Sequence, residues 1–154
     1  MVNVELDKVK TASTVNDFLN NELLDYLANA GMHRTDISSP QLNATGSNHS
    51  SSNSAEEKML KIFDYQNKCW AIGSTINNCS ETSRKILKAS VINATSDIQQ
   101  ISALNYSDRT FYRKKQEALC EFAQRLQYWA YRYDTNISDL RIFKKEKVQR
   151  VKNI

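Results

Sequence analysis

Glycine and proline are scarce in this chain, and their scarcity limits its possible folds more than any other feature. Its 154 residues include three Gly and one Pro. Because these residues mark turns and strand ends, a chain with so few of them favours helices. No segment alternates apolar and polar residues for long enough to indicate a strand. We therefore predict an all-α fold, a small helical bundle, in a chain long enough for one domain with or without an appendage.

The N-terminal part of the chain predicts one amphipathic helix from Ser13 to Ala30, with Gly31 as its C-cap. Its apolar face consists of Val15, Phe18, Leu19, Leu23, Tyr26 and Leu27. Residues 37–54 (ISSPQLNATGSNHSSSNS) hold the sole Pro and few apolar groups, which predicts a flexible, Ser- and Asn-rich linker. The first helix is then separate from the bundle. Packing of this helix back onto the bundle is the alternative.

Two more helices are predicted directly after this linker. Ser54 and Glu57 form a capping box for a helix at 55–78, and a further helix extends from Ser80 to Asn93. Their expected core-facing residues are Met59, Ile62, Phe63, Cys69, Trp70, Ile76, Ile86, Leu87 and Val91. The resulting regions are an N-terminal amphipathic helix region (1–36), the linker (37–54), a helical domain (55–131) and a basic C-terminal tail (132–154). We expect the closing stretch of this tail, residues 140–154 (LRIFKKEKVQRVKNI), to be frayed.

Residues 96–126 predict a helix-turn-helix. Ser96 and Gln99 form a capping box for a short helix. Its expected inward-facing residues are Ile98, Ile101 and Leu104. After a three-residue break, Ser107 caps a last helix that extends to Trp129 or beyond. Asn105 stands where such turns often have Gly, and Asn also tolerates the left-handed conformation that the turn requires.

The last helix separates an apolar arc from a polar face, as a DNA-reading helix requires. The apolar arc is Phe111, Ala118, Leu119, Phe122 and Leu126. The predicted DNA-binding residues are Ser107, Arg109, Thr110, Arg113, Lys114, Lys115 and Gln116. Arg pairs with guanine, Gln with adenine and Thr with the thymine methyl, whereas Lys and the Ser hydroxyl suit phosphates. A solvated basic face without a nucleic-acid role is the alternative.

The charge distribution agrees with a partner that is a polyanion. Residues 1–106 hold 9 Lys and Arg against 11 Asp and Glu, whereas residues 107–154 hold 12 against 6. The basic third of the chain therefore coincides with the predicted recognition helix and the tail. A solvated basic tail is again the alternative to this interpretation.

Other classes of function find little support. His33 and His49 share no metal-ligand spacing with any cysteine, and no Gly-rich phosphate loop is present, so we predict no enzyme, metal or cofactor. Three cysteines without a CxxC spacing suggest buried, reduced thiols. The N-terminus MVNVELDKVK lacks the apolar region of a signal peptide, and no run is apolar enough for a membrane span. We expect a cytoplasmic protein with no membrane partner.

Several stretches together resemble the ArpU family of phage-type transcriptional regulators. LNYSDRTFYRKKQEALCEFAQRL is similar to the C-terminal helix-turn-helix of that family, which in turn resembles region 4 of bacterial sigma factors. VNDFLNNEL, SSPQL, AEEKMLKIFD and INNCSETSRKIL also match, in order, across most of residues 14–126. The departures are Asn105 in place of Gly and a longer basic tail after Phe143.

The resemblance implies a regulator that activates late genes, for packaging and lysis, of a prophage in a bacterial host. It also implies a recognition helix that begins at Ser107, with Arg109, Thr110 and Arg113 at base-facing positions. Double-stranded DNA is the expected partner; RNA polymerase and a second protomer (a dimer) are further candidates, with the first helix as their handle. Two alternatives stay open: an anti-sigma-like helical adaptor, and a small terminase subunit, although the latter carries its DNA-binding unit at the N-terminus.

Overall fold

The structure, a computed structural model, describes residues 4–41 and 54–145. Its elements are α1 (Lys8–Asn20), α2 (Glu22–Ala30), the 3-10 helix η1 (Arg34–Ser38), α3 (Ser54–Asn77), α4 (Glu81–Leu87), the π-helical η2 (Lys88–Ile92), α5 (Asp97–Leu104) and α6 (Asp108–Arg132). In the described residues the one β-type pairing is an isolated antiparallel bridge between Leu6 and Phe143. The prediction of an all-α fold is confirmed.

The expected first helix is in fact two helices. α1 begins at Lys8, before the predicted Ser13, because the Asp7 carboxylate accepts a hydrogen bond from the Lys10 N–H at 3.0 Å and caps the helix. The helix is distorted at Asn21 (φ −117°, ψ −66°), which separates α1 from α2. α2 then ends at Gly31, which takes the left-handed conformation and is the predicted C-cap. The apolar spacing continues across the break, so it did not reveal the break.

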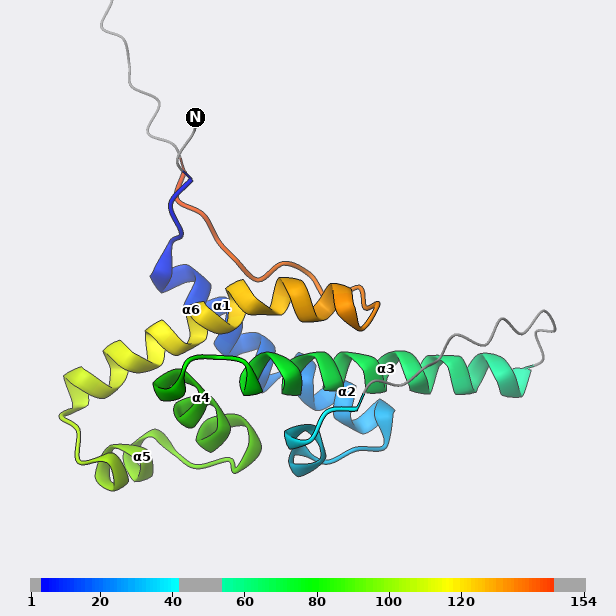
Figure 1. The fold of residues 1–154 in the computed structure, drawn as a ribbon, viewed down its shortest axis with the longest axis horizontal. Helices are drawn as coiled ribbons and strands as arrows, with labels where there is room; N and C mark the ends of the chain where they lie inside the picture. Colours follow the sequence, from blue (N-terminus) through cyan, green and yellow to red (C-terminus); the bar gives the residue numbers. More distant parts are fainter. Residues whose placement is uncertain (1–3, 42–53, 146–154) are drawn as a thin grey trace, which may run out of the picture.

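α1 and α2 are not separate from the bundle. Their buried residues belong to the same hydrophobic cluster as Phe122 of α6, and the rings of Phe18 and Phe122 lie 6.5 Å apart. α1 packs on α6 and α2 packs on α3 (Figure 1). The prediction of a separate N-terminal helix is therefore wrong, because an amphipathic stripe shows that a helix must be covered but not what covers it.

The segment before α3 is also part of the body. Ile37, which was assigned to the linker, is fully buried at the end of η1. α3 comes so close to η1 that a Cβ on Gly73 would lie 2.0 Å from the Ile37 carbonyl oxygen. Only a residue without a side chain fits at that crossing. The rest of the predicted linker, residues 42–53, lies outside the described residues.

α3 matches the predicted second helix closely, but its two halves differ in burial. Cys69 and Ile76 are buried as expected. Met59 and Ile62, also expected in the core, are 49% and 37% exposed. The reason is visible in Figure 1, where the first turns of α3 extend past the helices that cover its second half.

α4 is fixed to α6 by a polar contact at its N-terminus. Glu121 of α6 accepts hydrogen bonds from the backbone N–H and the hydroxyl of Ser80, both at 2.6 Å, and pairs with Arg125 at 2.8 Å. Burial opposes ionisation of Glu121, but these hydrogen bonds outweigh it and lower its pKa to about 2.

Beyond η2, Ala94 takes a left-handed conformation (φ 51°), which is unusual for a residue with a side chain.

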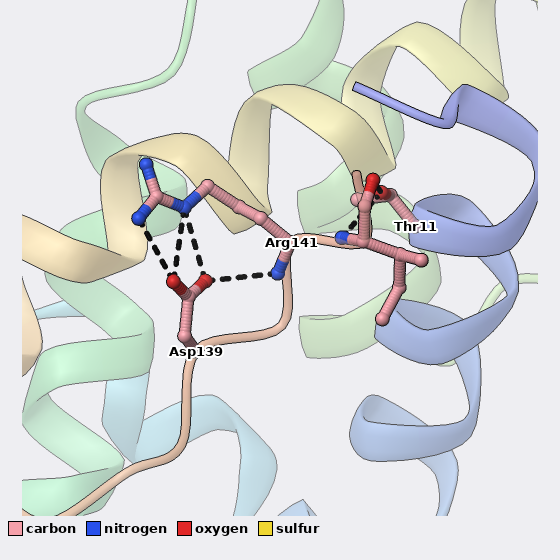
Figure 2. Close-up of polar contacts among 4 residues, drawn as sticks. Thr11, Asp139 and Arg141 are labelled. Carbon is pink, nitrogen blue, oxygen red and sulfur yellow. Dashed lines mark hydrogen bonds and ion pairs between the residues drawn. The ribbon is translucent and has the colours of Figure 1, made fainter. Parts of the chain in front are cut away.

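The C-terminal segment after α6 returns to the N-terminal end of α1. The Thr11 hydroxyl donates to the Ile142 carbonyl at 3.1 Å and accepts from the Ile142 N–H at 3.0 Å, while Arg141 forms a fork of hydrogen bonds with Asp139 (Figure 2). Leu140 is buried in the core. The expectation that the closing stretch is frayed is therefore wrong for residues 140–145; residues 146–154 lie outside the described residues.

Candidate nucleic-acid interface

A three-residue turn, residues 105–107, joins α5 to α6. Asn105 adopts the left-handed conformation (φ 54°, ψ 40°) that the sequence analysis required of it. The Ser107 hydroxyl caps α6 by accepting a hydrogen bond from the Thr110 N–H at 3.2 Å. The capping box of Ser96 and Gln99 at the start of α5 is also present. These local predictions are confirmed.

α6 has the two faces that the sequence predicted. Its apolar arc of Phe111, Ala118, Leu119, Phe122 and Leu126 is buried throughout. On the opposite side of its first two turns, Arg109, Tyr112 and Arg113 are exposed. Within residues 4–41 and 54–145 no carboxylate lies within ion-pair distance of either arginine. Both guanidinium groups are therefore available to an anionic partner.

Three other predicted residues lie beside these arginines. The Ser107 hydroxyl donates to the Thr110 hydroxyl at 2.9 Å, so each is oriented by the other at the start of the helix. The Lys114 ammonium lies 5.7 Å from the centre of the Tyr106 ring, a cation–π contact that directs it toward the turn. Lys114 is half-buried and still reaches solvent.

Lys115 and Gln116 take a different direction from the other five predicted residues. Lys115 forms an ion pair of 2.6 Å with Asp97 of α5, and its side chain is 19% exposed. Gln116 lines a shallow groove between α6 and α1 together with Ser13 and Asn16. The structure therefore brings Ser107, Arg109, Thr110, Arg113 and Lys114 to one end of α6, and places Lys115 and Gln116 on its α1 side.

α5 contributes little apolar packing, contrary to expectation. Ile98 and Leu104 were expected to point inward but are 79% and 37% exposed, and Ile101 is partly buried. The buried side chain of α5 is that of Gln100, whose amide donates to the Ser90 hydroxyl at 2.9 Å and to the Thr95 carbonyl at 3.1 Å. α5 lies at the edge of the molecule (Figure 1). Polar contacts therefore hold it against the body, where a hydrophobic face was expected to do so.

Tyr112 is the surface residue that the sequence analysis missed. It is 51% exposed between Arg109 and Arg113 and its ring contacts Phe111 edge-on. Its position three residues after Arg109 was a usable signal, because residues three and four apart share a helix face. An aromatic ring with a hydroxyl adds both stacking and hydrogen-bonding capacity to this surface.

The described residues contain no cluster of three His, Cys, Asp or Glu side chains that could hold a metal ion. Cys69, Cys79 and Cys120 are free and buried, as predicted. Burial raises the pKa of Cys69 and of Cys79 to about 12, which disfavours reactive thiolates. In that part of the chain no helix is long and apolar enough to cross a membrane.

Comparisons of this chain with protein-family models, with curated proteins and with solved structures found no match. The resemblance to the ArpU family therefore stays a prediction from the sequence.

Proposed function

We propose that this protein is a sequence-specific regulator of transcription that binds double-stranded DNA through the first two turns of α6. The observation that carries the proposal is the pair of exposed arginines, Arg109 and Arg113, at the start of a helix whose opposite face is buried. The preceding Asn105 turn lets the helix begin at an edge of the molecule, where a DNA groove can reach it.

In this proposal Arg109 and Arg113 read base edges, because a guanidinium can make two hydrogen bonds to guanine. Ser107 and Lys114, together with the free N–H groups of the first turn, contact phosphates. Tyr112 lies between the two arginines and packs against the sugar–phosphate backbone. Lys115 and Gln116 have supporting roles at most, since Asp97 and α1 engage them.

The biological setting that we propose follows the resemblance to the ArpU family: activation of late prophage genes for packaging and lysis, in a bacterial cytoplasm. An activator of this kind holds a promoter and recruits RNA polymerase, as a monomer or as a dimer. Because α1 and α2 belong to the core, we do not assign them a separate handle for the polymerase.

Selection from a pool of randomised duplexes, followed by footprinting of the enriched sequence at several salt concentrations, tests this function. We expect one enriched motif. Arg113→Ala should weaken binding to it by about 1–3 kcal/mol and relax the preference at one base pair. Arg132→Ala is the matched control, because Arg132 is an exposed arginine at the far end of the same helix. No enrichment, or equal losses for both variants, would refute the proposal.

A helical adaptor that binds an acidic protein partner is the second candidate function. The exposed apolar residues Met59, Leu60 and Ile62 on the first turns of α3 favour it, because such residues are common at protein interfaces. Under this alternative Arg113→Ala weakens capture of the partner, and the duplex selection yields no motif.

A further inference from the structure

A pocket of about 360 Å³ lies where the body of the protein meets α5 and α6. Residues of α1, η1, α4, η2, the start of α5 and α6 all line it. Its apolar wall includes Leu19, Leu87 and Leu119, which are buried. A volume of this size suits a small organic molecule, and pockets of that kind combine apolar walls with a few fixed polar groups.

The pocket carries one positive charge that the described residues do not balance. Lys115 and Asp97, which both line it, neutralise each other at 2.6 Å. Arg34 also lines it, and one of its terminal nitrogens donates to the Val91 carbonyl at 3.0 Å. No carboxylate of the described residues lies within ion-pair distance of Arg34. The guanidinium is thus held in position with donors left for an anion, and its planar fork matches a carboxylate.

A buried acceptor lies next to the same wall. Gln100 is 3% exposed, and its Oε1 accepts no hydrogen bond from the described residues. The amide nitrogen of Gln100 donates to Ser90 and Thr95, both of which line the pocket. A buried acceptor without a hydrogen bond lowers the stability of the fold. Gln100 itself does not line the pocket, but the Ser90 hydroxyl that it orients does, and this hydroxyl can donate to a hydroxyl on a bound molecule.

We propose that this pocket binds a small organic carboxylate with an apolar body and a hydroxyl group. The carboxylate pairs with Arg34, the body lies against Leu19, Leu87 and Leu119, and the hydroxyl reaches the Ser90 side. The occupant joins the body to the start of α5, a helix whose one buried side chain is Gln100. Binding therefore fixes α5. The consequence of this for DNA binding rests on the proposed function, whereas the binding site itself does not.

Titration of the isotope-labelled full chain with 4-hydroxybenzoate, followed by amide NMR at constant ionic strength, tests the inference without any DNA. We expect saturable shifts around Arg34, Ser90 and Asp97 within a titration to about 10 mM, ten times a dissociation constant of about 1 mM. Hydrogen exchange in α5 should slow on saturation. The uncharged 4-hydroxybenzamide should bind at least about tenfold more weakly, because it lacks the charge that Arg34 recognises.

Two variants and one control decide whether 4-hydroxybenzoate binds in this pocket. Arg34→Met should weaken 4-hydroxybenzoate binding at least about tenfold, and Arg132→Met, at an exposed arginine outside the pocket, should leave it unchanged. Asn16→Trp, at an exposed position on the pocket wall, should block binding while Arg34 is retained. Absence of saturable shifts, equal binding of the amide, or normal binding by Asn16→Trp would overturn the inference. A failed duplex selection would not affect this result.

Discussion

The contact between Glu121 and Ser80 should make the free energy of unfolding depend on pH, and this dependence can be measured. In the folded protein, hydrogen bonds lower the pKa of Glu121 from its ordinary value of 4.5 to about 2, in spite of the opposing effect of burial. A pKa that is lower in the folded state means that the ionised carboxylate stabilises the fold above pH 4.5. That stabilisation is lost as the pH falls from 4.5 toward 2.

The size of the effect follows from this pKa difference and from the exposure of the contact. At about 1.4 kcal/mol per unit of pKa difference, the change sets a ceiling of roughly 3.5 kcal/mol. The Arg125 partner is 49% exposed and the Glu121 side chain 20% exposed, so solvent screens part of the interaction. We expect Glu121→Gln to lower the free energy of unfolding near neutral pH by about 1–2 kcal/mol.

Urea unfolding followed by far-ultraviolet circular dichroism measures this difference. The gap between the wild type and Glu121→Gln should be largest near neutral pH and should shrink as the pH falls through 4.5 toward 2. Glu117→Gln, at an exposed carboxylate on the same helix, is the matched control and should change stability little. A double-mutant cycle with Ser80→Ala should show a coupling of about 1 kcal/mol. A gap that is independent of pH, or no coupling, would refute this reasoning.

Three further substitutions test the packing and the backbone by thermal unfolding. Gly73→Ala should lower the free energy of unfolding by about 1–3 kcal/mol, because its Cβ would overlap the Ile37 carbonyl. An unchanged melting temperature would show that α3 and η1 can move apart without a loss of stability. Ala94→Gly should raise the free energy of unfolding by about 1 kcal/mol, because glycine adopts the left-handed conformation without the steric strain of a Cβ. A lower melting temperature would contradict this. Thr11→Val should cost about 1–3 kcal/mol and speed hydrogen exchange at Ile142, since the Ile142 N–H loses its partner while the Ile142 carbonyl keeps the hydrogen bond from the Asp7 N–H. Unaltered exchange would argue against the contact.

Predictions from the sequence succeeded where the determining interactions are local. The cap at Ser107, the left-handed Asn105 and the apolar arc around Phe122 each depend on residues within a few positions of one another. The spacing along α6 therefore sufficed to separate its buried face from its exposed face. The position of Arg109 and Arg113 on the solvent side was predictable for the same reason.

The remaining features depend on contacts between distant parts of the chain. Lys115 was predicted to bind DNA, but its partner Asp97 belongs to another helix, and the spacing along α6 gives no sign of that ion pair. The burial of Ile37 depends on its contact with α3, which a polar, Ser-rich neighbourhood conceals. Ile98 is exposed because no other helix of the described residues covers it. The periodic pattern of a helix cannot indicate whether such a neighbour exists.

The pairing of Thr11 with Ile142 has a consequence for the connectivity of the chain. It joins residues 131 positions apart, and the neighbouring bridge between Leu6 and Phe143 joins residues 137 positions apart. Closing so long a loop is entropically unfavourable until the helices between its ends have packed. We therefore expect this closure to form last in folding and to open first, freeing the C-terminal segment while the helices stay folded. Because Leu6 and Phe143 are already neighbours, a circularly permuted chain that joins residue 145 to residue 4 should keep the same core.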